Sequence, residues 1–244
     1  MTPAGVTVIL GPKTRLGRAV ADRLRAGGET VLLVARDAAD AEVLGGGHEV
    51  VDVSTVDLSA RLAGAGSVRL IVAALGPVHP GPADLAGESP RVLRDLAVVE
   101  QVLDSGLPVH VVLVSSVIAL APGEDRRYYG GWKNLLEEQV GGLVAARPGC
   151  GLSVLYPGRL VESGGKPTQR VHTTYARVAE TVLALDPERP RSQVVGIDSR
   201  IWLVVRSISL CTRSLASSWG RTPPSSGGPV GGRSAASDPR EVSK

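Results

Sequence analysis

The stretch VTVILGPKTRLG, residues 6–17, decides the fold of this chain. It opens with a short run of apolar and β-branched residues that suits one buried strand, and Gly11 follows that run directly. From Leu16 to Arg25 the apolar side chains recur with the spacing of a helix. A buried strand, a glycine turn and a helix in this order predict the first unit of a doubly wound α/β sheet.

The same alternation continues to about residue 200. Most apolar runs are unbroken stretches of valine, leucine and isoleucine, which is typical of parallel strands buried on both faces. The sequence predicts strands at 6–10, 30–35, 49–53, 69–73, 109–115, 153–156 and 193–197. It predicts helices at 16–25, 56–62, 90–104, 129–145 and 174–185. We therefore expect an α/β fold with a Rossmann-type, doubly wound parallel sheet of about seven strands.

The composition changes near residue 200. Residues 201–219 are apolar with interspersed arginine and serine, whereas residues 220–244 are rich in glycine, serine, proline and arginine. We expect residues 1–200 to form a single catalytic domain, residues 201–219 an amphipathic segment and residues 220–244 a disordered tail. The amphipathic segment leaves three interpretations open: a last element packed on the core, a dimer element, or a helix at a membrane surface.

Charge and cysteine usage exclude several classes of protein. The formal net charge is +3, but the last 45 residues hold seven arginines and lysines against two acids, so the basicity belongs to the tail and not to a nucleic-acid-binding face. Cys150 and Cys211 have neither metal nor redox spacing, so we expect no metal site and two reduced thiols in a cytoplasmic protein. We find no signal-peptide pattern and no apolar run long enough to span a membrane.

A tyrosine and a lysine stand four residues apart, at Tyr129 and Lys133, in a chain that has only four lysines. On a helix these side chains share one face, whereas the rival phenol Tyr128 lies off that face. Ser115 and Ser116 end the apolar run that begins at residue 109. Because side chains alternate along a strand, only one of these serines can face the site, and we favour Ser116. The pattern predicts a hydroxyl, a phenol and an ammonium around one point.

The glycine turn after the first strand predicts a phosphate-binding site. Gly11 and Gly17 allow the backbone to bend tightly and to approach a pyrophosphate, with the first N–H groups of a helix aimed at it. The cations and hydroxyl between them suit an anion. The predicted contacts of this turn are Gly11, Lys13, Thr14, Arg15, Leu16 and Gly17.

Arg36 follows the second strand, at the position that selects the cofactor. A guanidinium there suits a 2′-phosphate, whereas an acid would bind the ribose diol of NAD(H). We therefore favour NADP(H), and the adjacent Asp37 keeps NAD(H) open as the alternative.

Taken together, these motifs resemble the short-chain dehydrogenase/reductase superfamily over residues 5–200. The marks, in chain order, are Gly11, Gly17, Arg36, Asp52, Ala74, Gly76, Ser116, Tyr129, Lys133, Pro157 and Gly158. Three features depart from the family: Arg15 replaces its middle glycine, Ala74 begins the element that reads Asn-Ala-Gly elsewhere, and the asparagine of the proton relay is missing. Residues 158–180 resemble the atypical and extended branches, which include sugar-nucleotide epimerases and NmrA-like proteins.

The resemblance implies a role for each matching residue. Ser116 would bond the substrate carbonyl, Tyr129 would donate or accept the proton, and Lys133 would bind the ribose and lower the pKa of the phenol. A free phenol titrates at about pH 10, and a nearby ammonium and an oxidised nicotinamide both favour phenolate. The resemblance also implies cofactor contacts for Asp52, Ala74, Gly76, Pro157 and Gly158, of which Asp52 would contact the adenine.

The substrate side is less defined. Residues 159–173 are the stretch available for a substrate lid, and the candidate substrate contacts are His79, Tyr156 and His172. We expect an NADP(H)-dependent oxidoreductase that interconverts a ketone and an alcohol of a small molecule by hydride transfer. An epimerase or dehydratase that retains NAD(P), and a non-catalytic NADP-binding NmrA-like sensor, remain as alternatives.

The source and the assembly are also expectations. The preference for arginine over lysine, with abundant alanine, glycine and valine, favours a high-GC genome and hence a bacterial enzyme of secondary-metabolite biosynthesis. The resemblance further implies a homodimer or a homotetramer.

Overall fold

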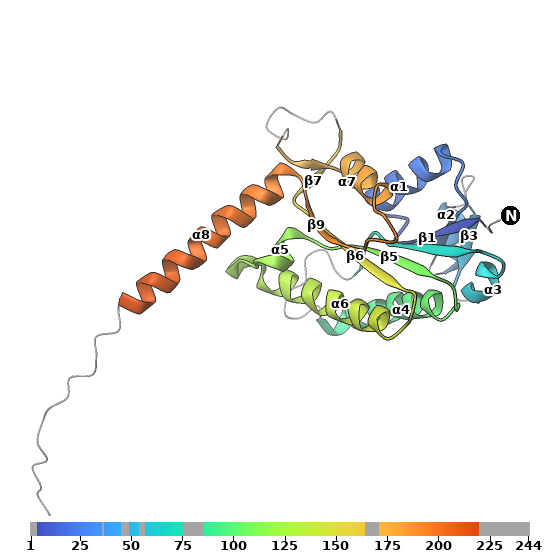
Figure 1. The fold of residues 1–244 in the computed structure, drawn as a ribbon, viewed down its shortest axis with the longest axis horizontal. Coiled ribbons are helices and arrows are strands. Elements are labelled where there is room, and N and C mark those ends of the chain that lie inside the picture. Colours follow the sequence, from blue (N-terminus) through green and yellow to red (C-terminus); the bar gives the residue numbers. More distant parts are fainter. Residues whose placement is uncertain are drawn as a thin grey trace, which may run out of the picture. The chain divides into compact units, whose positions relative to one another are not determined.

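Within the described residues, seven parallel strands form one sheet in the order β3-β2-β1-β4-β5-β6-β9 (Figure 1). The strands are β1 (Gly5–Leu10), β2 (Val31–Ala35), β3 (Glu49–Asp52), β4 (Ser67–Val72), β5 (Val109–Val114), β6 (Gly151–Pro157) and β9 (Ser192–Val195). The computed structural model describes residues 4–35, 37–44, 49–53, 57–75, 85–163 and 171–219. Arg36, Gly76, His79 and the predicted tail 220–244 lie outside them.

Helices cover both faces of this sheet (Figure 1). They are α1 (Arg15–Ala26), α2 (Ala38–Leu44), α3 (Leu58–Leu62), α4 (Leu85–Leu103), α5 (Val117–Leu120), the 3-10 turn η1 (Glu124–Arg126), α6 (Arg127–Ala145), α7 (Tyr175–Leu183) and α8 (Ile197–Trp219). One apolar cluster joins the sheet to α3, α4 and α6, and a second joins its other face to α1, α2 and α7. Every residue of β2 and β5 is buried, as expected for strands covered on both sides.

The strand order reverses between β1 and β4. From β1 the chain moves outward through β2 to β3, and it then returns to the other side of β1 and continues through β4, β5, β6 and β9. Such a reversal leaves a crevice at the carboxyl ends of the two central strands, where ligands bind in open α/β sheets. The predicted doubly wound parallel sheet is therefore confirmed, with all seven predicted strands in it.

Short and terminal elements differ from the sequence prediction. The helices α2 and α5, of seven and four residues, were not predicted, and each covers two helical turns or fewer. The small sheet of β7 (Leu160–Val161) and β8 (Thr173–Thr174) was missed as well. The last strand ends at Val195 and not at residue 197, because Gly196 adopts a φ of 99° and Ile197 already begins α8.

The turn between β1 and α1 is closed by its own side chains. Thr14 Oγ donates to Gly11 O at 2.8 Å and accepts from Gly17 N at 3.0 Å, which caps α1. A Cβ added to Gly17 would lie 2.5 Å from Gly11 O and 2.8 Å from the Cα of Pro12. Both glycines are thus required by space, and Gly11 also by its φ of 83°.

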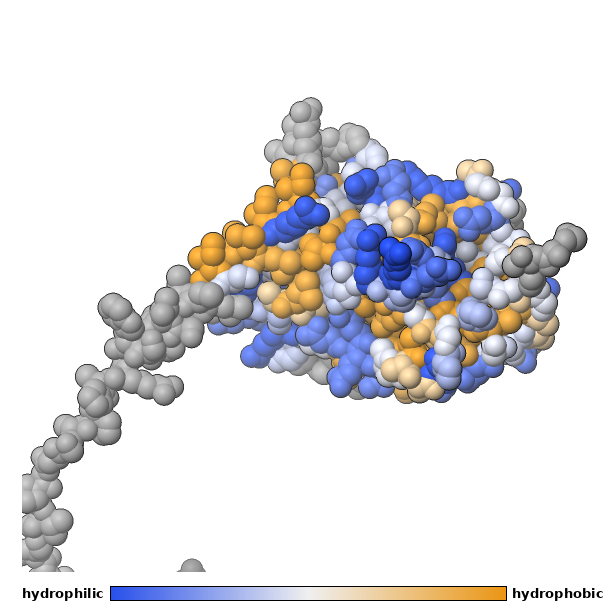
Figure 2. All heavy atoms as spheres, viewed as in Figure 1, coloured by the Kyte–Doolittle hydropathy of each residue, from blue (hydrophilic) through white to orange (hydrophobic). Residues whose placement is uncertain are grey.

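Two units make up the chain, Met1–Ser207 and Ile208–Lys244. In the first unit, α8 exposes Ile197, Ile201, Val204 and Val205 to between 54% and 67%, and Figure 2 shows apolar surface over this helix. Among the described helices none combines the length and hydropathy needed to cross a membrane. Membrane-surface contact through residues 201–219 and homo-oligomer formation stay predictions.

We expect Gly17→Ala to lower the free energy of unfolding by about 1–3 kcal/mol, because the added Cβ must displace backbone atoms of the turn. Gly142→Ala is the matched control, since Gly142 is exposed within α6 and has no neighbouring atom within 4 Å of an added Cβ. That change should stabilise the protein by up to about 1 kcal/mol through helix propensity. Urea unfolding measures both, and a Gly17→Ala protein as stable as wild type would contradict the close packing described above.

Candidate active site

A cleft of about 810 Å³ opens at the carboxyl ends of β5 and β6. Its wall contains five of the predicted site residues, which are Ser116, Tyr129, Pro157, Gly158 and His172. They come from the end of β5, the start of α6, the end of β6 and the segment before β8. The parallel sheet brings these segments together because all its strands end at the same edge.

The two serines at the end of β5 point in different directions. Ser116 Oγ accepts a bond from Ile118 N at 3.3 Å, which caps α5, and it lies near enough to Tyr129 to lower the pKa of that phenol. Ser115 Oγ instead donates to Glu137 on α6. The geometry therefore puts the Ser116 hydroxyl beside the phenol, as the alternation of a strand predicts.

Tyr129 is a partly exposed phenol with a raised pKa. Burial is the main cause, while the hydrogen bond with Ser116 and the positive charge of Arg126 act in the opposite direction. Lys133 lies on the same face of α6, with Nζ 5.7 Å from the centre of the Tyr129 ring. We expected its ammonium to lower the pKa of the phenol, but in the protein alone burial outweighs every such effect.

The ammonium of Lys133 is held away from the cleft wall. Its Nζ donates to the backbone carbonyl of Leu75 at 2.8 Å, just beyond the end of β4. Burial lowers the pKa of Lys133 to about 8, and the negative charge of Glu137 opposes this shift. Lys133 is therefore largely protonated at neutral pH, with its charge placed between α6 and the edge where the two halves of the sheet meet.

The predicted phosphate-binding turn lies at the same edge. Gly11 packs closely on Ala74, because a Cβ on Gly11 would lie 3.0 Å from Ala74 N. Residues 15–18, the first turn of α1, contain no acid, so the amino end of this helix carries the charge that suits a pyrophosphate. The turn residues thus fit a dinucleotide in their backbone geometry and in their charge.

The side chains of the turn have partners within the protein. Lys13 pairs with Asp40 at 2.6 Å, and Arg15 pairs with Glu162 at 3.4 Å on the surface. The Thr14 hydroxyl is used within the turn, and Leu16 and Gly17 are buried. Asp52 ends β3 beside Ala35 of β2. The contacts predicted for Arg36 and Gly76 fall outside the described residues.

Only one of the three predicted substrate residues lines the described wall of the cleft. His172 lies in the cleft with Nδ1 3.6 Å from Asp198, whereas the predicted His79 is outside the described residues. Tyr156 is 8% exposed and its hydroxyl donates to Glu137 at 2.8 Å, so it faces α6 and is absent from the described wall of the cleft.

Several residues of the cleft were not found from the sequence. They are Arg126, Tyr175, Asp198 and Trp202, whereas Arg159 belongs to the predicted lid 159–173. Asp198 accepts from Thr173 Oγ at 2.7 Å and from the Arg159 backbone N–H at 3.0 Å, and it thereby joins α8 to the segments around the cleft. No local signal marks these residues, because their side chains meet only through the fold.

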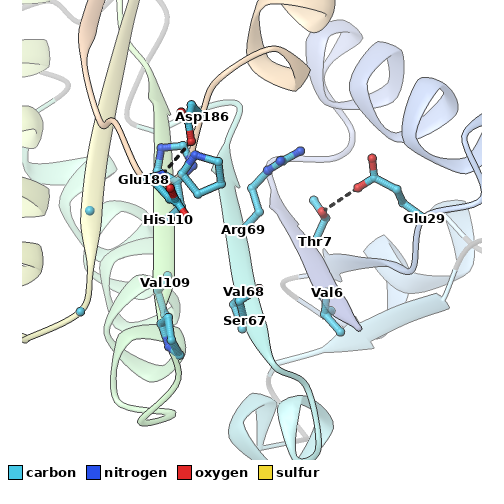
Figure 3. Close-up of a pocket in the computed structure, with 15 residues that line it drawn as sticks. Val6, Thr7, Glu29, Ser67, Val68, Arg69, Val109, His110, Asp186 and Glu188 are labelled. Carbon is cyan, nitrogen blue, oxygen red and sulfur yellow. Dashed lines mark hydrogen bonds between the residues drawn. The ribbon is translucent and has the colours of Figure 1, made fainter. Parts of the chain in front are cut away.

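A second cavity of about 750 Å³ lies at the opposite, amino edge of the sheet (Figure 3). The strand register aligns Thr7, Arg69 and His110 across β1, β4 and β5. The His110 ring lies 2.9 Å from Ser153 Oγ through Nε2, and burial lowers its pKa. None of the predicted site residues lines this cavity, so we place the candidate site at the carboxyl edge.

Neither a protein-family model nor a curated protein sequence matches this chain. Solved structures do match it. A short-chain dehydrogenase from Streptomyces avermitilis has 20% identity, a TM-score of 0.62 and coverage of 88% of this chain and 96% of its own. The chain has the fold of the short-chain dehydrogenases/reductases.

Two further structures with a similar fold are a dehydrogenase and an epimerase. A gluconate 5-dehydrogenase from Burkholderia cenocepacia, in complex with NADP and tartrate, has 14% identity and a TM-score of 0.61, covering 81% of this chain and 96% of its own. A UDP-N-acetylglucosamine 4-epimerase from Bacillus cereus has 15% identity and a TM-score of 0.56, covering 79% of this chain and 78% of its own. At these identities the likeness concerns the fold alone.

We expect Lys133→Met to raise the free energy of unfolding at neutral pH, because the folded protein buries an ammonium. The folded-state pKa is about 8 against 10.5 for the free side chain, so the unfolded chain binds more protons between these values. Wild-type stability should therefore rise with pH across that window. The advantage of Lys133→Met should be at most about 3 kcal/mol below pH 8 and should vanish above pH 10.5.

Urea unfolding at several pH values from 7 to about 10.5 measures this difference. Lys13→Met removes an exposed lysine and serves as the control for the loss of one surface charge. A Lys133→Met protein whose stability stays parallel to wild type across the window would contradict a buried ammonium.

Proposed function

We propose that this protein is an NADP(H)-dependent oxidoreductase that interconverts a ketone and an alcohol of a small molecule by hydride transfer. One observation carries the proposal: Ser116 and Tyr129 line the same cleft at the carboxyl edge of the sheet, with the Lys133 ammonium one helical turn beyond the phenol. The glycine turn of β1 and α1 meets Ala74 at that edge, where this fold type places a dinucleotide.

The chain supplies proton transfer and orientation, and the nicotinamide cofactor supplies or accepts the hydride when bound. The Ser116 hydroxyl donates to the substrate carbonyl and aligns it with the phenol. Tyr129 donates its proton to the carbonyl oxygen during reduction and takes it back during oxidation. Since burial raises the pKa of Tyr129, the phenol holds its proton in the protein alone, and Ser116 and Arg126 ease its release.

Lys133 supports that proton transfer through its positive charge. Its ammonium is anchored to the Leu75 carbonyl and lies beside the Tyr129 ring, where it favours the anionic form of the phenol as the proton leaves. In the proposed complex the same ammonium holds the nicotinamide ribose. Because its pKa is about 8, this support is lost as the pH rises above that value.

The choice of NADP(H) rests on Arg36 and on the charge of the turn. A guanidinium after the second strand suits a 2′-phosphate, and Lys13 and Arg15 add positive charge between the two glycines. The gluconate 5-dehydrogenase of the same fold was solved with NADP, which supports a nicotinamide cofactor of this kind.

A second candidate is an epimerase or dehydratase that retains NAD(P) through its cycle. Arg15 at the place of the family's middle glycine and the likeness to UDP-N-acetylglucosamine 4-epimerase favour it. A nicotinamide that stays bound through purification, with no net change of its absorbance on turnover, would select this candidate. Cofactor binding with no turnover on any carbonyl or sugar nucleotide would select an NmrA-like sensor instead.

We expect Tyr129→Phe to lower kcat by about 10²–10⁴-fold, because the phenol is the proposed proton donor. The Kd for NADPH should change by less than about threefold, or less than about 0.7 kcal/mol, since Phe keeps the ring. NADPH consumption over a panel of ketones and aldehydes, with a fluorescence titration of NADPH, gives both values.

Tyr128→Phe is the matched control for this change. Tyr128 precedes Tyr129 and is exposed, and its hydroxyl accepts a hydrogen bond from the neighbouring Arg127, so its removal should leave kcat unchanged. A Tyr129→Phe protein with wild-type kcat would refute the proposed role.

We expect Arg36→Ala to raise the KM for NADPH by about 10–100-fold, the effect of losing a charge-assisted hydrogen bond worth about 1.5–3 kcal/mol. The KM for NADH should stay close to its wild-type value, because NADH has no 2′-phosphate. Steady-state kinetics with the two cofactors test this selectivity. Equal effects on both KM values would argue against a 2′-phosphate contact.

A further inference from the structure

Glu137 lies one helical turn beyond Lys133 on α6 and is only partly exposed. Both of its carboxylate oxygens are hydrogen-bonded. Oε1 accepts from Ser115 Oγ, and Oε2 accepts from the Tyr156 hydroxyl at 2.8 Å. A carboxylate with an acceptor bond at each oxygen is held in one orientation, because its two partners come from different strands.

These two partners stand next to residues of the candidate site. Ser115 directly precedes Ser116 at the end of β5, and Tyr156 directly precedes the Pro157-Gly158 turn at the end of β6. One carboxylate thus ties two strand ends to the helix that carries Tyr129 and Lys133. These two hydrogen bonds hold the ends of β5 and β6 against α6, and the proposed substrate and cofactor must fit beside these elements.

We propose that Glu137 is a positioning residue, which locks the ends of β5 and β6 onto α6 and holds a negative charge beside the Lys133 ammonium. The positional role rests on the proposed function, since it concerns the placement of Ser116, Tyr129 and Lys133. The electrostatic role does not, because it concerns the protonation of one lysine in the protein alone.

The surroundings of Lys133 explain why a charge at this place matters. Burial disfavours the ammonium, and the Leu75 carbonyl is a neutral acceptor that compensates only in part. From its own helix Lys133 faces Tyr129 and Glu137, and from β6 Tyr156 reaches the same carboxylate. Glu137 is the group whose charge acts on Lys133 among the described residues, and it opposes the effect of burial on the pKa of Lys133.

Tyr156 donates a hydrogen bond from its hydroxyl to Glu137 Oε2. Burial, and then the hydrogen bond and the charge of Glu137, raise the pKa of this phenol, so it stays a proton donor to the carboxylate. Two hydroxyl donors stabilise an ionised carboxylate. Both carboxylate oxygens of Glu137 therefore meet hydroxyl donors, one helical turn from Lys133.

The titration of Lys133 tests the proposal directly. The full-length protein is acetylated with acetic anhydride at a series of pH values and is then digested for mass spectrometry. The extent of acetylation gives the pH midpoint for deprotonation of each lysine, and the chain has only four. In wild type we expect a midpoint for Lys133 at about 8. Glu137→Gln keeps the shape of the side chain but removes its charge, and it should lower this midpoint by on the order of one pH unit.

Three control variants separate the charge from its surroundings. Glu138→Gln removes the same charge from the adjacent, exposed position on α6 and should leave the midpoint in place. Tyr156→Phe and Ser115→Ala each remove one hydrogen bond to Glu137 and keep its charge, so they should move the midpoint by only a few tenths of a pH unit at most. A Glu137→Gln protein that retains the wild-type midpoint overturns the proposal.

Glu137→Asp tests the positional role and covers the case in which the Gln variant does not fold. It keeps the charge but withdraws the carboxylate by one methylene from the two hydroxyls. We expect kcat to fall about tenfold with the midpoint of Lys133 retained. Wild-type kcat in this variant overturns the positional role.

The two proposals fail separately. A lowered midpoint in Glu137→Gln together with a fully active Tyr129→Phe protein leaves the charge effect standing and refutes the reaction. An unchanged midpoint together with an inactive Tyr129→Phe protein refutes the role of Glu137 and leaves the reaction standing.

Discussion

Parallel pairing of strands that are buried on both faces is the constraint on which the rest of this structure depends. It sends the carboxyl ends of β1, β4, β5 and β6 to one edge of the sheet. The glycine turn, the Leu75 carbonyl, Ser116 and the Pro157-Gly158 turn all follow these strands, so a single edge receives all of them. Helix α6 then adds Tyr129 and Lys133 to the same edge.

Burial at this edge has a cost that the site uses. Around the Lys133 ammonium, hydration is partly replaced by one backbone carbonyl and by the charge of Glu137. Around the Tyr129 phenol, it is partly replaced by the neighbouring Ser116. The pKa of Tyr129 is raised and that of Lys133 is lowered, and both shifts favour the uncharged form of the side chain, as desolvation requires. Burial thus brings the pKa of Lys133 close to neutral pH and makes Tyr129 hold its proton more firmly, so the same desolvation acts on both groups of the proposed chemistry.

Much of the architecture could be read from the sequence, because local patterns carry it. Unbroken valine and leucine runs marked the buried strands, and the spacing of Tyr129 and Lys133 placed both on one helical face. The short helices α2 and α5 escaped, although α3, of five residues, was predicted. Tyr156 was expected to face the substrate because it adjoins the Pro157 turn, but the pleat of β6 directs its hydroxyl to Glu137.

The sequence by itself determined the order of strands and helices, the glycine turn and the helical spacing of the Tyr129 and Lys133 pair, because each depends on neighbours within a few residues. Only the tertiary structure decided which serine meets the phenol, where the Lys133 ammonium is anchored and that Glu137 joins two strands to α6. These outcomes depend on groups that are 13 to 58 residues apart in the chain and meet through packing. Burial and charge at such contacts are properties of the assembled fold, which a linear pattern does not contain.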